Sequence, residues 1–419
     1  MRYKALYGTH DILPGESAVW QYFEEKLRKV FALYNYSEIR TPIFEETELF
    51  ARSIGQDTDI VQKEMYTFAD QGKRSLTLRP EGTAGVVRAY IEHSLGEKSP
   101  LVKLFYLGDM FRQERPQKGR LREFHQFGVE AIGSADPSLD AEVIEMGVRI
   151  CREVGITDCK LHLNSIGCPV CRPVHRDQFL GFMRGKVTDL CDDCKSRFMR
   201  NPLRMFDCKK EGCIEQLKDA PVMVDFLCAD CRTHYDRVRK YLQDLKVDYF
   251  EDKRLVRGLD YYTRTAFEIK SSLLGSQDTL CGGGRYDLLV EELGGEKTPA
   301  IGFAAGIERF MLLLAVQKKR DFEESKLNLF IATLGDEAKT FAAKLVSDLR
   351  QKNVTCDTDY LQRSLKAQMK EANRQKAEKV LIIGEEEMKQ GKAVLRDMGT
   401  GEQKEIGLTE VDQIWSVHL

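Results

Sequence analysis

Hydrophobic positions recur at helical spacing near the start of the chain and then alternate with polar positions. The spacing from Val19 to Phe31 predicts an amphipathic helix over 15–34. The alternation that follows predicts strands, with helices between them. In order, we expect a strand at 36–46, a hairpin of 65–70 and 74–80, a helix at 82–95, strands at 101–114 and 122–133, a helix at 139–154 and a strand at 160–167.

A cysteine-rich segment, residues 168–231, interrupts this order, which resumes at residue 254. The polar string KKRDFEESK, residues 318–326, is expected to be a linker. Beyond it, the pattern predicts a compact α/β domain of order βαβαββ, with strands at 328–335, 354–360, 379–384 and 392–397 and helices at 337–352 and 364–378. The fold class is therefore predicted as α+β, in which antiparallel strands carry helices on one side.

Composition sets three limits on what the chain can be. Its 419 residues exceed one ordinary core, so we expect two or three domains. A net charge of −2 gives no overall basic field, so a nucleic-acid partner would be held by local patches. No apolar run reaches the ~18 residues of a membrane span, and the first residues carry no apolar signal segment. We therefore expect a cytoplasmic protein without membrane contact.

The stretch FRQERPQKGRLREFHQFGVE, residues 111–130, gathers basic side chains in a chain of nearly zero net charge. Arg112 and Glu114 alternate on one predicted strand, and Gln126 and Glu130 on the next, so the hairpin is expected to line one pocket. Guanidinium groups are well suited to phosphate oxygens, and the basic loop suits a nucleic-acid backbone. A solvated hairpin with surface ion pairs would explain the charges alone.

Four further stretches are each weak evidence when taken alone. LTLRPEGT, residues 76–83, places Glu81 and Thr83 at a strand exit, which suits either a ligand's ammonium group or a helix cap. RGLDYYTRTAFE carries Arg257 and two tyrosines, or simply turns into a strand. The glycines of CGGGRYDLL let the backbone approach a ligand, or form a tight turn. GFAAGIERFMLLL turns from strand to helix with Arg309 near its start, a weak signal by itself.

Taken together and in order, these stretches resemble the signatures of class II aminoacyl-tRNA synthetases and, within that class, of the histidyl-tRNA synthetase family. The resemblance covers nearly the whole chain. YSEIRTPIFEE is similar to motif 1, which forms the dimer interface in this class. FRQE with its loop is similar to motif 2, and GIER to motif 3. RGLDYY and GGGRYD are similar to the two histidine-specific signatures.

The resemblance implies a fold and an assembly. An antiparallel-sheet catalytic domain would occupy 1–167 and 251–320, with motifs 1 and 2 in the first part and motif 3 in the second. A small cysteine-rich insertion domain would occupy 168–250, and an α/β anticodon-binding domain 327–419. The protein would be a homodimer.

The resemblance also implies substrates and the residues that bind them. The substrates would be ATP with Mg²⁺, L-histidine and tRNA-His, and the catalytic residues would be Arg112 and Arg257. ATP would be bound by Arg112, Glu114, Arg120 and Arg309. Histidine would be bound by Glu81, Gly82, Thr83, Arg112, Gln126, Glu130, Arg257, Tyr261 and Tyr262. The acceptor end of the tRNA would be met by Gln117, Arg120 and Arg122.

The implied reaction, ligation of histidine to tRNA, has two steps. The histidine carboxylate attacks the α-phosphorus of ATP to give histidyl-adenylate and pyrophosphate, and the terminal 3′-hydroxyl of the tRNA then takes the histidyl group. Neutral imidazole is one donor and one acceptor, so Glu130 and the hydroxyl of Tyr262 are expected to serve one ring nitrogen each. A site of buried hydrogen bonds rejects analogues by roughly 10⁴ or more, so we expect no editing domain.

The run LQRSLKAQMKEANRQKAEK in the C-terminal domain carries a basic face. Arg363, Lys366, Lys370 and Arg374 recur at helical spacing, which is typical of an RNA contact or of a solvated helix. The resemblance to anticodon-binding domains favours the RNA contact.

Eight of the twelve cysteines form four close pairs, which is where the chain departs from the best-known members of the family. The pairs are Cys168 with Cys171, Cys191 with Cys194, Cys208 with Cys213, and Cys228 with Cys231. Two such pairs complete a four-thiolate zinc site, so one or two structural Zn²⁺ ions without a chemical role are expected. The first two pairs have a spacing usual for zinc ribbons, but the sequence does not fix which pairs share an ion. Reduced buried cysteines and a redox-active pair are the alternatives.

Two other functions fit parts of the pattern. The regulatory subunit of ATP phosphoribosyltransferase shares the catalytic fold, but it lacks an anticodon-binding domain and has eroded catalytic signatures. The presence of Arg112, Arg257 and Arg309 and of a C-terminal domain argues against it. A zinc-organised nucleic-acid-binding module would explain the cysteines and basic patches, but not LRPEGT, RGLDYY and GGGRYD together.

Overall fold

The computed structural model describes residues 3–56, 58–317 and 327–411, and the chain divides into two compact units, 1–320 and 321–419. The expected linker at 318–326 lies outside the described residues. No helix within the described ranges has both the length and the apolar character needed to cross a bilayer.

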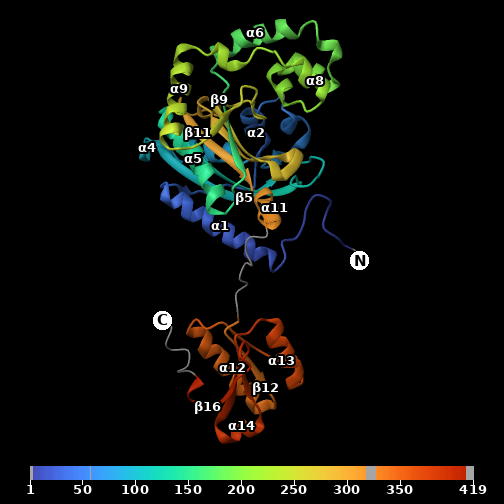
Figure 1. Ribbon diagram of the computed structural model, residues 1–419, viewed down its shortest axis with the longest axis vertical. Helices are drawn as coiled ribbons and strands as arrows, with labels where there is room; N and C mark the ends of the chain where they lie inside the picture. The colour runs from blue at the N-terminus through green and yellow to red at the C-terminus, as the bar shows by residue number, and fades with distance from the viewer. Residues whose placement is uncertain (1–2, 57, 318–326, 412–419) are drawn as a thin grey trace. The chain divides into compact units, whose positions relative to one another are not determined.

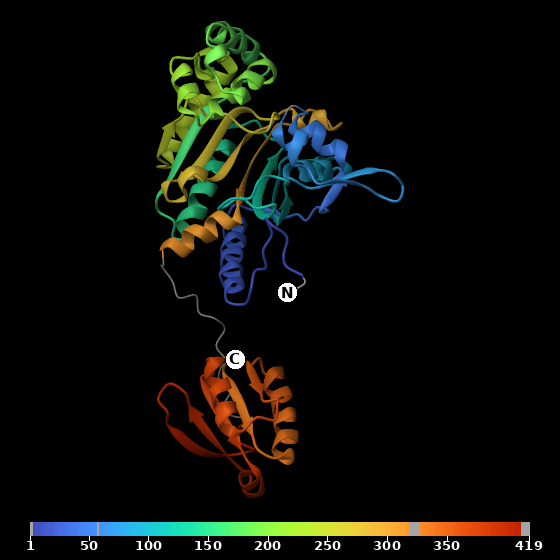
Figure 2. The same cartoon turned by 90° about the vertical axis from the view of Figure 1, so that its right-hand side faces the viewer.

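A large, mostly antiparallel sheet forms the centre of the first unit (Figures 1 and 2). It has eight strands in the order β1-β5-β6-β11-β10-β9-β7-β8, of which the edge pairs β1–β5 and β7–β8 are parallel. The strands are β1 Ser37–Glu38, β5 Val102–Phe111, β6 Glu123–Ile132, β7 Cys159–Ser165, β8 Tyr249–Glu251, β9 Thr263–Ser271, β10 Thr279–Arg285 and β11 Ala300–Gly306. The α+β class and the antiparallel catalytic sheet are confirmed.

Helices cover both faces of this sheet. On one face, apolar side chains of α1 (Glu16–Leu33), α5 (Pro137–Glu153), α9 (Ala229–Asp244) and α11 (Ile307–Gln317) pack with those of the strands. On the other face, α3 (Thr83–Glu92) and α10 (Leu289–Glu292) form a second core. The prediction of helices on one side is therefore wrong, because α3 buries Val86, Val87 and Tyr90 against the opposite face.

A smaller sheet of order β2-β4-β3 accompanies α3, with strands β2 Phe44–Glu46, β3 Thr67–Ala69 and β4 Ser75–Leu78. The predicted hairpin of β3 and β4 is confirmed. The predicted strand at 36–46 is instead two short strands in different sheets, with Pro42, which has no N–H to donate, between them. Short helices nearby are α2 Thr47–Ile54, the π-helix η1 Ile60–Glu64 and α4 Leu95–Lys98, and η5 Ser272–Gln277 follows β9.

The cysteine-rich segment folds as a set of short helices at one end of the first unit (Figure 1). They are α6 Cys171–Met183, η2 Val187–Asp189, α7 Asp192–Arg200, η3 Pro202–Asp207, α8 Glu211–Gln216 and η4 Met223–Phe226, followed by α9. Their shared core is small and centres on Phe179, Met183 and Met205. A core of this size rarely stabilises a domain without an added cross-link.

The second unit contains a five-stranded sheet of order β13-β12-β14-β15-β16, parallel from β13 to β14 and antiparallel after it. Its elements are β12 Leu329–Thr333, α12 Asp336–Gln351, β13 Cys356–Thr358, α13 Leu365–Arg374, β14 Lys379–Ile383, α14 Glu385–Gln390, β15 Lys392–Asp397 and β16 Gln403–Gly407. The predicted βαβαββ order is confirmed except that α14 lies between its last two strands and β16 follows them. The prediction omitted α14 and β16, because both are short and mostly polar.

Candidate active site

A cavity of about 320 Å³ lies on the α3 side of the large sheet. Residues from several distant segments line it, and ten of them were predicted to bind ATP or histidine: Glu81, Thr83, Arg112, Glu114, Arg120, Gln126, Arg257, Tyr261, Tyr262 and Arg309. Gly82 and Glu130 are not among the lining residues. The structure therefore brings most of the predicted active-site residues into one place.

The loop between β5 and β6 supplies cationic groups to one end of the cavity. The prediction that Arg112 and Glu114 lie on the strand is wrong, because β5 ends at Phe111. Arg112 Nε donates to the Pro80 carbonyl at 3.0 Å. Glu114 forms an ion pair with Arg120, with 2.9 Å between Nη1 and the carboxylate oxygen. Burial raises the pKa of Glu114, while Arg120 and Arg112 oppose that shift.

Arg309, at the start of α11, holds the tip of this loop. Its Nε donates to the Gly119 carbonyl at 3.2 Å, and its Nη1 donates to the Thr279 carbonyl. Burial and the neighbouring Arg120 lower the pKa of Arg309. Three guanidinium groups thus line the same end of the cavity, an arrangement that binds phosphate oxygens.

Arg257 lies across the backbone of β10. Its Nη1 forms an ion pair with Glu268 at 2.6 Å, and its guanidinium lies over the Tyr262 ring at 5.1 Å. Burial opposes the charged form, but Tyr262 and Glu268 raise the pKa of Arg257. A Cβ at Gly282 would lie 2.5 Å from Nη1, so any larger residue there would displace the guanidinium from this position.

Glu268 also lines the cavity, and the sequence analysis missed it. The signal was present in TAFEIKS, where Glu268 is the charged residue in the middle of a strand of mostly buried residues. A carboxylate in a strand of this kind indicates a function or a buried partner.

Glu81 lies at the start of α3 and accepts hydrogen bonds from the backbone N–H groups of Thr83 at 2.7 Å and Ala84 at 2.8 Å. Thr83 as the N-cap residue is wrong, because Thr83 is already the first residue of α3; the Glu81 carboxylate instead accepts from the first helical N–H groups. Burial raises the pKa of Glu81. Gly82 lies behind the cavity wall, where a Cβ would overlap the Tyr106 ring.

Glu130 lies beneath the cavity in a fully buried cluster. The Thr83 hydroxyl donates to its carboxylate at 2.7 Å, and the Tyr286 hydroxyl also donates to it. Burial raises the pKa of Glu130 to about 8, despite these two donors. Sequence reasoning missed Tyr286, although it stands in the GGGRYD signature, because only the glycines and the arginine were weighed there.

Gln126, on the same strand as Glu130, also lines the cavity. Its Oε1 is buried and has no hydrogen-bond partner within the described part of the chain. Buried polar atoms are rarely left unpaired, so this oxygen is suited to a ligand donor such as an ammonium group.

His125 explains part of the aromatic end of the opening stretch. Its ring bonds Glu308 through Nδ1 at 2.8 Å and Asp109 through Nε2 at 3.1 Å. Burial lowers its pKa, but the two carboxylates outweigh this and raise it to about 10. The imidazolium therefore fastens β6 to the start of α11.

The residues expected to meet tRNA differ in how free they are. Gln117 is exposed at the loop tip. Arg122 is held within the protein, since its N–H donates to the Gly8 carbonyl at 2.8 Å and its Nε to the Glu114 carbonyl at 3.4 Å.

In the second unit, the prediction of a basic face on one helix is partly wrong. Arg363 precedes α13 and binds Asp359 and Glu371, so its charge is compensated. Lys366 and Lys370 are exposed on the helix, one turn apart.

The eight paired cysteines form two groups of four. The first joins Cys168, Cys171, Cys228 and Cys231, and the second joins Cys191, Cys194, Cys208 and Cys213, with all four Sγ atoms of each group within 4.8 Å of one another. Sulfur separations include 3.6 Å, 3.9 Å and 3.9 Å. Tetrahedral zinc with four thiolates at about 2.3 Å places sulfurs about 3.8 Å apart, so each group fits such an ion.

Family models, sequence relatives and a solved structure all indicate the same family. A family model described as "Histidyl-tRNA synthetase" matches residues 8–170 and 200–310, and one described as "Anticodon binding domain" matches 328–415. The "Histidine--tRNA ligase" of Moorella thermoacetica is 52% identical over 96% of both chains, and that of Halothermothrix orenii is 51% identical over 98% of both. The crystal structure of apo S. aureus histidyl-tRNA synthetase has a TM-score of 0.83 and 42% identity over 99% of both chains.

The raised pKa of Glu130 predicts a pH-dependent stability. Between its ordinary value of 4.5 and about 8, the folded chain holds a proton that the unfolded chain has released. The free energy of unfolding should therefore fall as pH rises through this window, and Glu130 alone should account for about 3 kcal/mol of the fall between pH 5.5 and 8. Urea unfolding at both pH values measures it. In Glu130→Gln the difference in unfolding free energy between the two pH values should be smaller, although it does not vanish, because the raised pKa of His125 also lowers stability as pH rises. A difference equal to that of the parent chain would contradict the assignment.

Proposed function

Since the chain belongs to the histidyl-tRNA synthetase family and ligates histidine to tRNA, we propose that the 320 Å³ cavity binds ATP and L-histidine side by side and forms histidyl-adenylate. The observation that carries this proposal is the convergence of four arginines with Glu81, Gln126 and two buried tyrosines on one cavity: the arginines are Arg112, Arg120, Arg257 and Arg309.

The arginine-rich end would bind ATP. Arg112 and Arg309 are held by backbone carbonyls, so their guanidinium groups are oriented before substrate arrives. Glu114, paired with Arg120, would face the adenine end. Adenylate formation is an in-line displacement in which positioning and charge stabilisation supply most of the catalysis.

Mg²⁺ is expected to accompany ATP. Carboxylate oxygens of Glu114 and Glu268 line the cavity, and these are the donors that Mg²⁺ prefers. The ion would neutralise charge on the phosphates when bound.

Arg257 would contact the α-phosphate and the histidine carboxylate, where negative charge develops. Glu268 and Gly282 fix its guanidinium against β10, so little reorganisation is needed during the reaction. Arg257 is therefore the residue on which the first step should depend most.

The opposite end of the cavity would bind histidine. Glu81, Thr83 and the free Oε1 of Gln126 would take its ammonium group. The imidazole would lie by Tyr261 and Tyr262, above Glu130. Because Glu130 already accepts from Thr83 and Tyr286, it would act from beneath the ring as one member of a buried network.

Transfer RNA would meet both units. Gln117, Arg120 and Arg122 belong to the loop that borders the cavity, which suits the acceptor end. Lys366 and Lys370 offer exposed charge on α13 for the anticodon arm, with Arg363 contributing less because two carboxylates share it. A Lys366→Glu/Lys370→Glu variant that binds tRNA as tightly as the parent chain would contradict this anticodon contact.

A homodimer is supported by the small sheet of motif 1. Phe44 and Phe68 are exposed, and their rings meet edge to face at 6.3 Å beside the exposed Ile43. Such a cluster favours a protein partner. Sedimentation at the monomer mass would contradict a dimer. We also propose a cytoplasmic location, and finding the protein outside that compartment on cell fractionation would contradict it.

The role of Arg257 predicts the outcome of pyrophosphate exchange. Histidine should support exchange of labelled pyrophosphate into ATP without tRNA, and other amino acids should not. Arg257→Ala should lower the rate by about 10²-fold or more, because one pre-oriented charge is lost. Arg237→Ala, an exposed arginine on α9, is the matched control. A rate in Arg257→Ala close to that of the control would refute the assignment.

The two cysteine groups predict two zinc ions per chain. Elemental analysis of the purified protein should find both, and Cys191→Ser/Cys208→Ser should lose one and unfold at a lower temperature. Cys159→Ser, outside both groups, should keep two. One ion per chain in the parent protein, or none, would contradict the pairing.

A further inference from the structure

The tyrosine pair that borders the histidine end lies at an irregular point of the sheet. On β9, Ala266 pairs with Gly284 and Thr263 pairs with Arg285, which leaves two residues between them without partners on β10. One of these, Arg264, has a left-handed backbone with φ of 50°. That conformation is unfavourable for a residue with a side chain, and it coincides with the break in the β9–β10 register.

The root of the cysteine-rich domain holds this irregular segment. The Arg264 N–H donates to the Gly167 carbonyl at 2.8 Å, and the Ile166 N–H donates to the Arg264 carbonyl at 2.8 Å. Arg172, in the first turn of α6, donates through Nη2 to the Tyr262 carbonyl and through Nε to the Ile166 carbonyl at 3.3 Å. One guanidinium therefore joins the end of β7 to the residue before β9.

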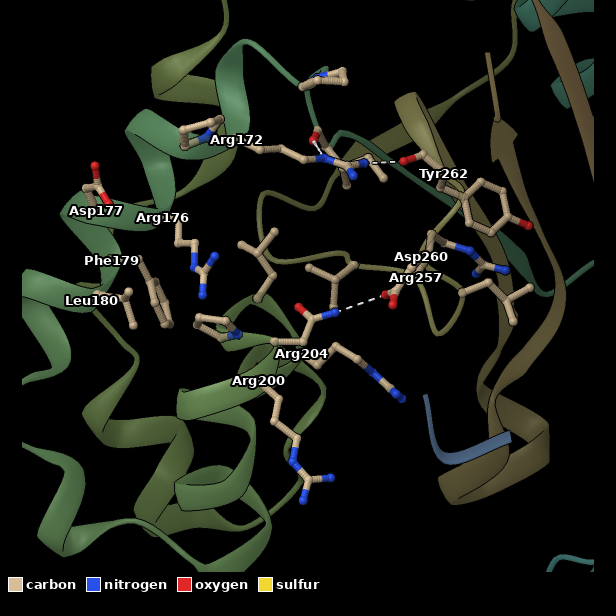
Figure 3. A pocket seen from close by; sticks show the side chains of 18 residues that line it. Arg172, Arg176, Asp177, Phe179, Leu180, Arg200, Arg204, Arg257, Asp260 and Tyr262 are labelled. Atoms are coloured by element: carbon tan, nitrogen blue, oxygen red, sulfur yellow. Dashed lines mark hydrogen bonds between the residues drawn. The ribbon is translucent and has the colours of Figure 1, made fainter. Parts of the chain in front are cut away.

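Figure 3 shows Arg172 reaching across the wall of a second cavity, of about 500 Å³, toward Tyr262. Arg257 and Tyr262 line both cavities, so this contact lies directly behind the proposed histidine site. Burial lowers the pKa of Arg172. In the portion of the chain that the structure describes, Arg172 forms no ion pair, and its hydrogen bonds go to two backbone carbonyls, while the nearby Asp260 favours its charged form.

The first cysteine group fixes the backbone from which Arg172 extends. The N–H groups of Cys171 and Arg172 both donate to the Cys168 carbonyl, at 3.0 Å and 3.1 Å. The Cys228 N–H donates to Cys171 Sγ at 3.1 Å. The start of α6 is thus wrapped around the sulfur cluster, which limits where the Arg172 side chain can lie.

We propose that Arg172 is a positioning residue for the first reaction step. It ties the first cysteine group to the Tyr262 carbonyl and so sets the tyrosine ring for histidine. This inference rests on the proposed role of Tyr262 in binding histidine. Arg257 keeps its ion pair with Glu268, and Arg112 and Arg309 are held by other elements, so the loss of Arg172 acts on histidine more than on ATP.

Steady-state pyrophosphate exchange and calorimetric titration with histidine test this role. Arg172→Gln should raise the KM and the Kd for histidine about tenfold, as expected for loss of a charged hydrogen bond, and change the KM for ATP less than about twofold. Arg172→Lys, which keeps the charge but replaces the planar guanidinium that reaches both carbonyls with a compact ammonium, should be intermediate. Arg176→Gln, exposed one turn further along α6, should leave both constants unchanged.

Tyr262→Phe separates this proposal from the proposed function. If Tyr262→Phe weakens histidine binding and neither Arg172 variant does, the positioning role is overturned and the histidine site stands. If histidine and ATP constants change together, or if only kcat and the unfolding midpoint fall, Arg172 is merely structural and the proposal is also overturned. If Arg172→Gln does not fold, Arg172→Lys decides by the same criteria.

Discussion

Bare backbone at a few glycines lets large side chains lie directly on the central sheet beneath the cavity. A Cβ at Gly282 would strike Arg257, one at Gly302 would strike Glu130, and those at Gly82 and Gly128 would strike Tyr106. Gly302 lies opposite Glu130 in the β11–β6 register. These approaches are closer than a Cβ can make without displacing its neighbour, so an alanine at any of these positions would force the side chain above it to shift.

A buried network of charged side chains connects the strands beneath the cavity to the helices of the first unit. Arg285, which is fully buried, binds Asp140 and also Asp287 at 3.0 Å. Asp140 accepts in addition from Thr265 at 2.6 Å and bonds His234 at 2.8 Å. The network therefore joins β9 and β10 to α5 and to α9, the closing helix of the cysteine-rich segment. Breaking one member would leave an uncompensated buried charge, which is strongly destabilising.

Sequence reasoning recovered the residues that line the cavity because polar side chains in short signatures are visible without a fold. It missed Glu268 and Tyr286, whose roles depend on which strands become neighbours. It placed Arg112 on a strand that ends one residue earlier, since strand ends depend on tertiary hydrogen bonds. The pairing of the cysteines was open for the same reason: Cys168 and Cys228 meet only because α6 and α9 begin side by side. The spacing placed Arg363 on a helical basic face, but Arg363 precedes α13 and is bound to Asp359 by a backbone hydrogen bond and an ion pair.

The central claim is that the bare backbone at Gly282 lets Arg257 lie on the sheet in the orientation that adenylate formation needs, and one substitution tests it directly. The rate of histidine-dependent pyrophosphate exchange should be measured in Gly282→Ala, with Gly181→Ala, whose new methyl group would enter open space, as the control. The account predicts that Gly282→Ala falls by about 10²-fold, as expected for displacement of one pre-oriented charge, with a nearly unchanged unfolding midpoint. Exchange at the rate of the control would show that Arg257 needs no bare backbone beneath it, and would contradict the account.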